Sequence, residues 1–183
     1  MLTQQEFEAW CHRNQLSEAG RELIMEIRTC DPVRAVASRK GNVSGAYCSE
    51  KMGQTIQFES HRGELAHLID HLEHNRMALE FYDQPSKIQL IYLSKSNRKV
   101  TTTHTPDFFV IERNWAGWEE FKTIEELALK AQTQPNRYQQ DAEGNWRCPP
   151  GEEYAQKYGL GYRIRTSAEL NPIRLRNWIW LEP

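Results

Sequence analysis

The segment THTPDFFVIERNWAGWEEFKT, residues 103–123, places charged residues inside two apolar, strand-like runs. Asp107 begins the first run, and Glu120 and Lys122 interrupt the second, where Phe, Val, Ile and Trp indicate burial. Charges in a core are costly unless they are paired or bind a metal. The function of the chain therefore depends on how these three residues are arranged.

Strand alternation decides which of the charged residues can meet. Successive side chains of a strand point to opposite faces, so Glu120 and Lys122 share one face, and Glu119 and Phe121 share the other. Asp107 follows a proline whose fixed φ helps define the start of its strand. If residues 114–117, AsnTrpAlaGly, form the turn of a hairpin, Asp107 and Glu120 lie on neighbouring strands near one end of the sheet.

Two carboxylates that converge in this way can bind a hard divalent cation such as magnesium through oxygen ligands. The ammonium of Lys122 can orient or help deprotonate a water, or neutralise charge that develops on a phosphate. The pattern alone is also compatible with an ion pair of Lys122 with Glu120 or Asp107 at a half-exposed sheet edge.

The rest of the chain predicts helices and further short strands. We expect helices at about 3–11, 17–27, 61–76, 124–132, 152–158 and 168–181, and strands at about 79–84, 87–93, 99–103, 107–112, 118–123 and 161–165. Residues 31–53 are rich in glycine, basic and hydroxyl residues, which is typical of irregular or short-strand structure. The order of elements predicts an α/β fold with a mixed sheet flanked by helices.

Composition sets the broad class. A chain of 183 residues, 39% hydrophobic and 26% charged, suits one globular domain. It contains neither an apolar run of about 20 residues nor a secretion signal, so we expect a cytoplasmic protein that does not enter a membrane. The four cysteines form no CxxC pair, which indicates reduced thiols rather than a zinc ribbon. The net charge of −2 means that any nucleic-acid binding would come from a local basic patch.

These residues resemble a known family. Pro106-Asp107 followed by Glu120-Phe121-Lys122 resembles the core motif of the PD-(D/E)xK nucleases. The upstream segment QFESHRGELAHLIDHLEHNRMALEFYDQPSKIQL, residues 57–90, is similar to the TnsA endonucleases of Tn7-like transposons, as are KGNVSGAYCSEKMG (40–53) and GYRIRTSAELN (161–171). The resemblance covers roughly residues 37–181.

The resemblance implies a fold, a site and an activity. The fold is a restriction-endonuclease-like mixed sheet in one nuclease domain spanning residues 1–183, with a short helical lead-in over about 1–30. Glu64, at the edge of the apolar stripe of the 61–76 helix, is implied as a third carboxylate. Glu64, Asp107, Glu120 and the carbonyl of Phe121 would bind one or two Mg²⁺ ions, for which Mn²⁺ can substitute, and Lys122 would position the attacking water.

The same resemblance implies cleavage of DNA at transposon 5′ ends, together with a TnsB-like transposase and an ATP-dependent, TnsC-like regulator. TnsA proteins usually carry a further helical domain, whereas this sequence ends at LRNWIWLEP. The chain is therefore a fragment, a short family member, or a nuclease that serves another system. Two alternatives remain: a stand-alone restriction-like or repair nuclease, and an inactive DNA-binding adaptor with the nuclease fold.

Two further clusters bear on DNA and metal binding. Basic residues gathered before and at the start of the Glu64 helix are candidates for phosphate contacts: Arg34, Arg39, Lys40, Lys51 and Arg62. Lys95, Arg98 and Lys99 form a second basic turn. The 61–76 helix also carries four histidines, His61, His67, His71 and His74. We expect these histidines to form a solvated helix face, with a groove contact or a zinc site as the alternatives.

Overall fold

The computed structural model describes residues 1–32, 45–58 and 62–181, and of Arg62 and Ile179 only the backbone. Its centre is a four-stranded sheet in the order β10-β7-β6-β3. The strands are β3 (Ala78–Asp83), β6 (Phe108–Glu112), β7 (Ala116–Lys122) and β10 (Gly161–Thr166). β6 pairs antiparallel with β3 and with β7, whereas β10 pairs parallel with β7. The prediction of a mixed sheet within an α/β fold is therefore confirmed.

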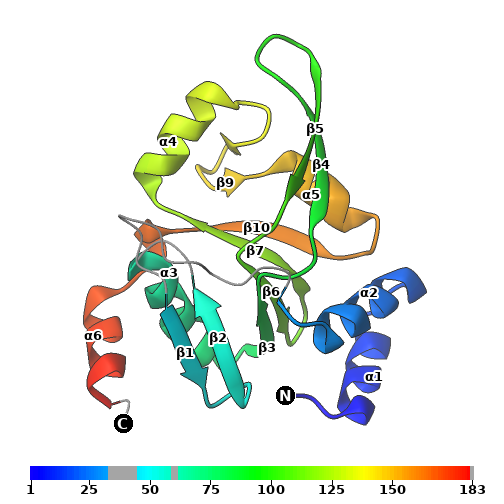
Figure 1. Ribbon diagram of the computed structural model, residues 1–183, viewed down its shortest axis with the longest axis vertical. Helices are drawn as coiled ribbons and strands as arrows, with labels where there is room; N and C mark the ends of the chain where they lie inside the picture. The colour runs from blue at the N-terminus through cyan, green and yellow to red at the C-terminus, as the bar shows by residue number, and fades with distance from the viewer. Residues whose placement is uncertain (33–44, 59–61, 182–183) are drawn as a thin grey trace.

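Helices and small hairpins lie on both sides of this sheet (Figure 1). On one side are α3 (Arg62–His67), α6 (Pro172–Leu181) and the hairpin of β1 (Gly45–Ser49) and β2 (Gln54–Phe58). On the other side are α4 (Ile124–Thr133), α5 (Pro149–Gln156) and the hairpin of β4 (Ile88–Leu93) and β5 (Lys99–His104). A further short hairpin joins β8 (Gln139–Gln140) to β9 (Trp146–Arg147), and a 3₁₀ turn, η2 (Ser167–Glu169), precedes α6.

The core lies where the central strands pass between these layers. In β6 the four residues Phe108–Ile111 are completely buried, which explains the continuous apolar run in the sequence. Trp118 of β7 is also completely buried, and its ring contacts Phe109 and Tyr154 edge to face. The two charged ends of β7 and β6 are therefore held by a rigid, well-packed frame.

The N-terminal lead-in is helical, as the sequence predicts. α1 (Gln4–Arg13) and α2 (Glu18–Thr29) begin after the capping residues Thr3 and Ser17, whose side chains accept backbone hydrogen bonds. Arg28 of α2 forms a buried ion pair with Glu80 of β3, with Nε 2.9 Å from Oε2. The lead-in thus packs directly against the sheet and shares its core.

The predicted helix at 61–76 differs from the expectation. It begins as the α-helix α3 but continues as a π-helix, η1 (Leu68–Glu73). In η1 the apolar residues Leu68, Ile69 and Leu72 are buried, and so are Asp70 and Glu73. The segment is covered on more than one side, because α6 and the β1–β2 hairpin both contact it through Asp70 and Glu73. Of the described helices, none is long and apolar enough to cross a membrane.

Candidate metal and catalytic site

The hairpin of β6 and β7 brings Asp107 and Glu120 to the same end of the sheet. The register pairs Phe108 with Glu119, so Asp107, one residue before β6, lies opposite the Glu120–Phe121 segment. Asp107 Oδ2 accepts a hydrogen bond of 2.8 Å from the main-chain nitrogen of Phe121. The predicted meeting of Asp107 with the Glu120 segment at one strand end is confirmed. The turn, however, comes earlier than 114–117, because Ala116 and Gly117 already belong to β7 and pair with Ile111 and Val110.

The two adjacent glutamates have separate surroundings, as alternation predicts. Both side chains are almost fully buried. Glu120 Oε1 lies 3.2 Å from Nζ of Lys122. Glu119 points to the opposite face, where its Oε2 lies 2.8 Å from Nε2 of His67. The residue that shares a site with Lys122 is therefore Glu120.

Three oxygen atoms lie around the ammonium of Lys122. They belong to the carbonyl of Phe121 at 2.8 Å, to Glu120 at 3.2 Å and to Asp107 at 3.5 Å. Burial alone would lower the pKa of Lys122, but the charges of Asp107 and Glu120 outweigh burial and raise it above its ordinary value. Lys122 is therefore protonated at neutral pH, so it acts as a charge and a hydrogen-bond donor rather than as a base.

Two tyrosines and a histidine contact the carboxylate of Glu120. The hydroxyl of Tyr138 donates to Oε1 at 3.0 Å, and that of Tyr162 donates to Oε2 at 2.7 Å. Nε2 of His104 lies 3.4 Å from Oε2. Burial would raise the pKa of Glu120, but Lys122 and then His104 lower it well below the ordinary range, so Glu120 stays ionised.

Sequence reasoning did not identify these three supporting residues. Tyr138 lies in the polar stretch after α4, and Tyr162 in β10, so both come from segments distant from the motif. The only local signal is for His104, which lies three residues before Asp107 at the end of β5. Such contacts depend on tertiary packing, which the spacing of one motif does not encode.

Glu64 lies on the helix that packs against this end of β7. A Cβ atom added at the preceding Gly63 would come within 2.7 Å of the Phe121 ring, so α3 sits directly on that ring. The ring of His67, one turn later, is 5.6 Å from the ring of Phe121. Glu64 itself is buried. Within the described ranges, however, no three His, Cys, Asp or Glu side chains are grouped so that they could hold a metal ion, and Glu64 stays a predicted ligand.

The oxygen donors around Lys122 nevertheless suit a hard cation. Carboxylate and carbonyl oxygens are the ligands that Mg²⁺ prefers, at distances of about 2.0–2.1 Å. The same oxygens now lie 2.8–3.5 Å from Nζ of Lys122, so a bound cation would replace the ammonium and draw the carboxylates inward. The residues present fit the chemistry of a Mg²⁺ site formed by Asp107, Glu120 and the Phe121 carbonyl.

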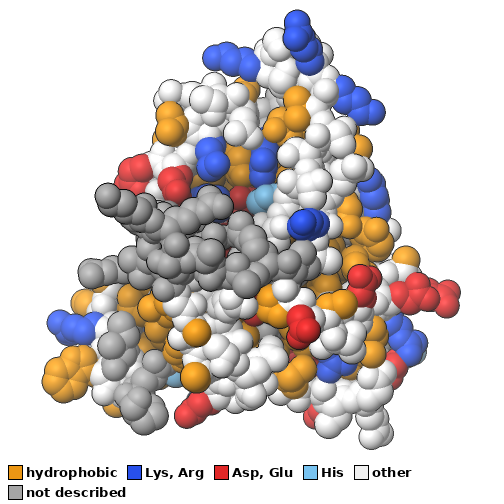
Figure 2. Space-filling view, viewed as in Figure 1, with side chains coloured by type: hydrophobic (Ala, Val, Ile, Leu, Met, Phe, Trp, Pro, Cys, Tyr) orange, Lys and Arg blue, Asp and Glu red, His pale blue; other side chains and the backbone are white. Residues whose placement is uncertain are grey.

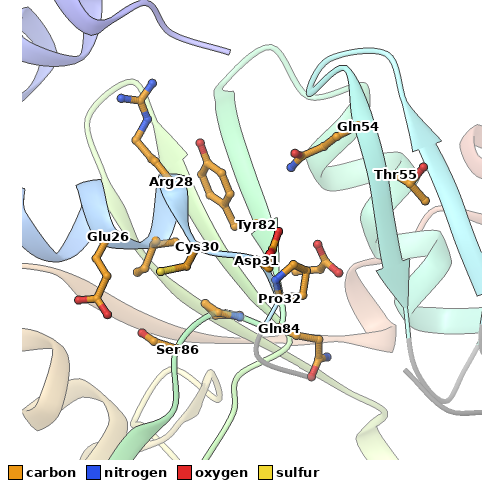
Figure 3. Close-up of a pocket in the computed structure, with 13 residues that line it drawn as sticks. Glu26, Arg28, Cys30, Asp31, Pro32, Gln54, Thr55, Tyr82, Gln84 and Ser86 are labelled. Carbon is orange, nitrogen blue, oxygen red and sulfur yellow. The ribbon is translucent and has the colours of Figure 1, made fainter. Parts of the chain in front are cut away.

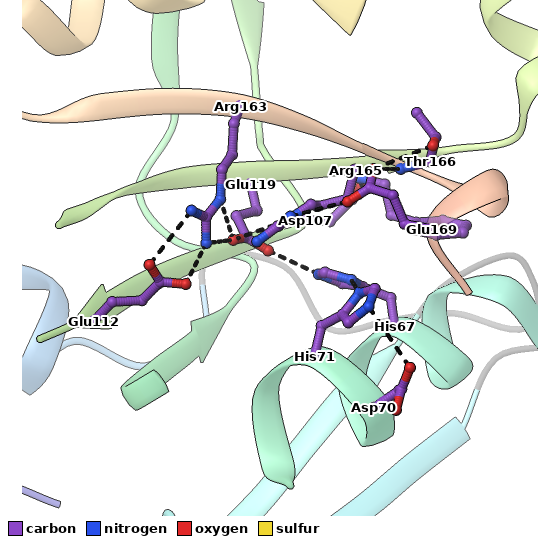
Figure 4. Close-up of polar contacts among 11 residues, drawn as sticks. His67, Asp70, His71, Asp107, Glu112, Glu119, Arg163, Arg165, Thr166 and Glu169 are labelled. Carbon is purple, nitrogen blue, oxygen red and sulfur yellow. Dashed lines mark hydrogen bonds and ion pairs between the residues drawn. The ribbon is translucent and has the colours of Figure 1, made fainter. Parts of the chain in front are cut away.

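A second charge network lies on the opposite face of β7, around Glu119 (Figure 4). Arg163 Nε donates to Glu119 Oε1 at 2.6 Å and also reaches Glu112, with Nη2 2.5 Å from Oε1. On the other side of Glu119, Nδ1 of His67 lies 3.1 Å from Nδ1 of His71. Burial alone would raise the pKa of Glu119, but the hydrogen bond to His67 and the charges of His67, Arg163 and Arg165 outweigh it and lower the pKa. The pair of His67 and Glu119 joins α3 to β7 inside the core.

These contacts correct the expectation of a solvated histidine face. His67 is completely buried between the rings of Phe108 and Phe121. His74 stacks on Trp178 of α6, with ring centroids 4.0 Å apart. The expectation failed because a helical wheel treats the face away from the apolar stripe as solvent, whereas here the sheet and α6 cover it. His61 lies outside the described residues.

Of the five predicted DNA contacts, the structure describes the side chain of Lys51 alone. Arg34, Arg39 and Lys40 lie outside the described residues, and of Arg62 only the backbone is described. The ammonium of Lys51 donates to three main-chain carbonyls between the end of η1 and the start of β3, those of Leu72, Asn75 at 2.8 Å and Ala78 at 3.0 Å. Burial lowers the pKa of Lys51. Lys51 thus caps a helix end, and we do not retain it as a proposed DNA contact.

A separate small cavity lies between α2, β2 and the end of β3 (Figure 3). Its volume is about 90 Å³, roughly the space of three water molecules. Gln84 lines it in a left-handed backbone conformation with φ of 43° and donates its main-chain N–H to the carbonyl of Asp107 at 3.0 Å. The cavity shares no residue with the Asp107, Glu120 and Lys122 set and is too small for a nucleotide.

In comparisons with known proteins, no protein-family model and no curated protein matches this chain.

Proposed function

We propose that this protein is a metal-dependent DNA endonuclease of the PD-(D/E)xK type, similar to TnsA. The observation that carries the proposal is the position of the Lys122 ammonium among Asp107, Glu120 and the Phe121 carbonyl. These three are the oxygen ligands that the motif resemblance assigns to the cation, and a positive charge already lies between them. Buried carboxylates kept ionised at a strand end are typical of a site that binds a cation.

The residues of the chain have distinct roles in this proposal. Glu120, fixed by Tyr138 and Tyr162, and Asp107 would hold Mg²⁺ with the Phe121 carbonyl. Bound Mg²⁺ would activate a water and stabilise the leaving oxygen during phosphodiester hydrolysis. Lys122, protonated, would orient the attacking water and neutralise charge on the phosphate.

The packing of α3 supports a place for Glu64 in this site. The helix rests on Phe121, between Glu120 and Lys122 in sequence, and the buried pair of His67 and Glu119 fixes it there. If Glu64 turns toward a cation bound by Asp107 and Glu120, its carboxylate would become a third carboxylate ligand of that cation. Partners are proposed from the resemblance alone: duplex DNA at transposon 5′ ends, a TnsB-like transposase and a TnsC-like ATP-dependent regulator.

The test is cleavage of plasmid DNA that carries transposon ends, in Mg²⁺ or Mn²⁺, with and without the transposase and the regulator. We expect Asp107→Asn and Glu120→Gln to reduce cleavage at least about 100-fold, because each removes an anionic ligand of the cation that would activate the water and stabilise the transition state. Glu153→Gln is the matched control, since Glu153 is an exposed residue of α5 and should leave cleavage unchanged.

The outcomes separate the alternatives. Folded Asp107→Asn and Glu120→Gln variants that cleave like wild type would refute the proposed site. Metal-dependent cleavage without partners, lost in both variants, would indicate a stand-alone nuclease. DNA binding without cleavage in either metal, even with both partners present, would indicate an inactive adaptor.

A further inference from the structure

The hairpin of β4 and β5 carries positive charge in a chain that is acidic overall. Residues 84–106 contain Lys87, Lys95, Arg98 and Lys99 and no Asp or Glu, whereas the net charge of the whole chain is −2. All four basic side chains are exposed. Figure 2 shows Lys and Arg side chains gathered at and beside the top of the view, where the tip of this hairpin lies in Figure 1.

The hairpin is anchored to the rest of the protein both near its base and in its outer part. One face is anchored in the core through Ile88 and Leu90, which are buried. Asn136 donates to the carbonyl of Leu93 at 2.9 Å, which ties the outer part of the hairpin to the segment after α4. The opposite face is exposed and consists of Gln89, Ile91, Leu93, Lys99, Thr101 and Thr103.

The base of the hairpin is part of the candidate site. β5 ends at His104, whose Nε2 lies 3.4 Å from Glu120 Oε2 and 3.1 Å from the Tyr162 hydroxyl. Asp107 follows three residues later. Each strand has six residues, which span roughly 20 Å at about 3.3 Å per residue. The distance from the basic tip to the carboxylates is thus about one hairpin length. This distance is comparable with the width of a DNA duplex.

We propose that the β4–β5 hairpin is a DNA-binding arm that contacts the phosphate backbone of the duplex beside the scissile phosphate. The proposal rests on the proposed nuclease function, because it assigns the substrate to the same site. Duplex DNA carries one negative charge per about 1.7 Å of its axis, so a row of exposed basic residues without carboxylates is complementary to it. Exposed threonines and Gln89 add neutral hydrogen-bonding groups of the kind that contact phosphates.

The test compares two triple variants of equal charge. The hairpin variant is Lys95→Gln, Arg98→Gln and Lys99→Gln. The control is Arg13→Gln, Arg76→Gln and Arg113→Gln. These three exposed residues lie at the C-terminal end of α1, before β3 and after β6. Arg113 follows the end of β6 that is opposite to Asp107, so the control charges lie at the other end of the sheet.

Binding to a fluorescein-labelled DNA duplex of about 30 base pairs is measured by anisotropy at several salt concentrations, with EDTA in place of Mg²⁺. Each lost phosphate contact should reduce the slope of log K against log salt by about 0.9, so the hairpin variant should lose about 2–3 in slope. At low salt we expect an affinity loss of roughly tenfold or more, while the control variant binds like wild type.

The binding assay contains no Mg²⁺ and requires no cleavage, so it separates this inference from the nuclease proposal. Unchanged binding and slope in the hairpin variant would overturn the inference, even if Asp107→Asn abolishes cleavage. Equal losses in both triple variants, or a wild-type protein that does not bind duplex DNA, would also overturn it. If the hairpin variant binds DNA like wild type but fails to cleave in reactions that contain the transposase, the inference is overturned and the hairpin contacts a protein partner instead.

Discussion

Replacing Lys122 with methionine tests whether its ammonium occupies the cation position. Methionine keeps much of the side-chain volume but leaves Glu120 buried beside Asp107 without the positive charge between them. Loss of one partner of a buried pair costs about 3–5 kcal/mol. The Lys122 side chain is 19% exposed and Glu120 keeps its tyrosine bonds, so we expect a loss of about 2–3 kcal/mol in the free energy of unfolding.

A divalent cation should restore part of this loss. Without the ammonium, the two carboxylates and the Phe121 carbonyl are free to bind Mg²⁺, whereas in wild type the cation must first displace Lys122. At a Mg²⁺ concentration about ten times the dissociation constant, the gain is about 1.4 kcal/mol, or roughly 3–6 °C in melting temperature for a chain of this size. The increase should be larger for Lys122→Met than for wild type.

The assay is thermal unfolding of each protein with EDTA and with increasing Mg²⁺. Lys51→Met is the matched control, because Lys51 is another partly buried lysine but its ammonium contacts main-chain carbonyls rather than two carboxylates. This control should lose stability and respond to Mg²⁺ like wild type. An equal Mg²⁺ response in Lys122→Met and wild type would refute the reasoning that the ammonium and the cation compete for one position.

Three further predictions concern the core around this site. His67→Leu should cost about 2–4 kcal/mol in urea unfolding, because it removes a buried partner of Glu119; a loss below about 0.5 kcal/mol would show that the pair contributes little. Gly63→Ala should lower thermal stability by about 1–3 kcal/mol, because its Cβ would lie 2.7 Å from the Phe121 ring, and an unchanged melting temperature would mean that the ring moves freely. The free energy of unfolding should fall on acidification below about pH 5, because the pKa values of Glu119 and Glu120 are lower in the folded state than in the unfolded state. The stability that these two carboxylates contribute is complete above the unfolded pKa of about 4.3. It is lost as the pH falls toward the folded pKa values. Urea unfolding that shows constant stability from about pH 5 to pH 3 would contradict this assignment.

Much of the sheet could be predicted because its strands are short, apolar and separated by turn residues. β4, β5, β6 and β10 differ from expectation by about one residue at their ends. β7 begins two residues before the expected 118, because Ala116 and Gly117 pair with β6 instead of forming the turn. β2 was not predicted, because its polar residues alternate with only Ile56 and Phe58 as buried positions. The π-helix η1 has no signal in apolar spacing, which is read with the period of an α-helix.

The candidate site shows the same division between local and distant information. The choice of Glu120 over Glu119 follows from alternation, and the approach of Asp107 follows from the hairpin, so both could be predicted from one short segment. The roles of Lys51 and His67 could not, because each is set by residues distant in sequence. The segment from the end of η1 to the start of β3 supplies the carbonyls for Lys51, and β7 supplies Glu119 for His67. Sequence spacing indicates which face a side chain shares but not which element covers that face.

The position of a bound cation is the most direct test of the central claim. Crystals grown with Mn²⁺, in place of Mg²⁺, locate the ion by its anomalous scattering. We predict an ion bound by Asp107, Glu120 and the Phe121 carbonyl, with the Lys122 ammonium displaced from its present position between them. Crystals that contain Mn²⁺ elsewhere but retain Lys122 between the two carboxylates, with no ion bound to them, would contradict the claim.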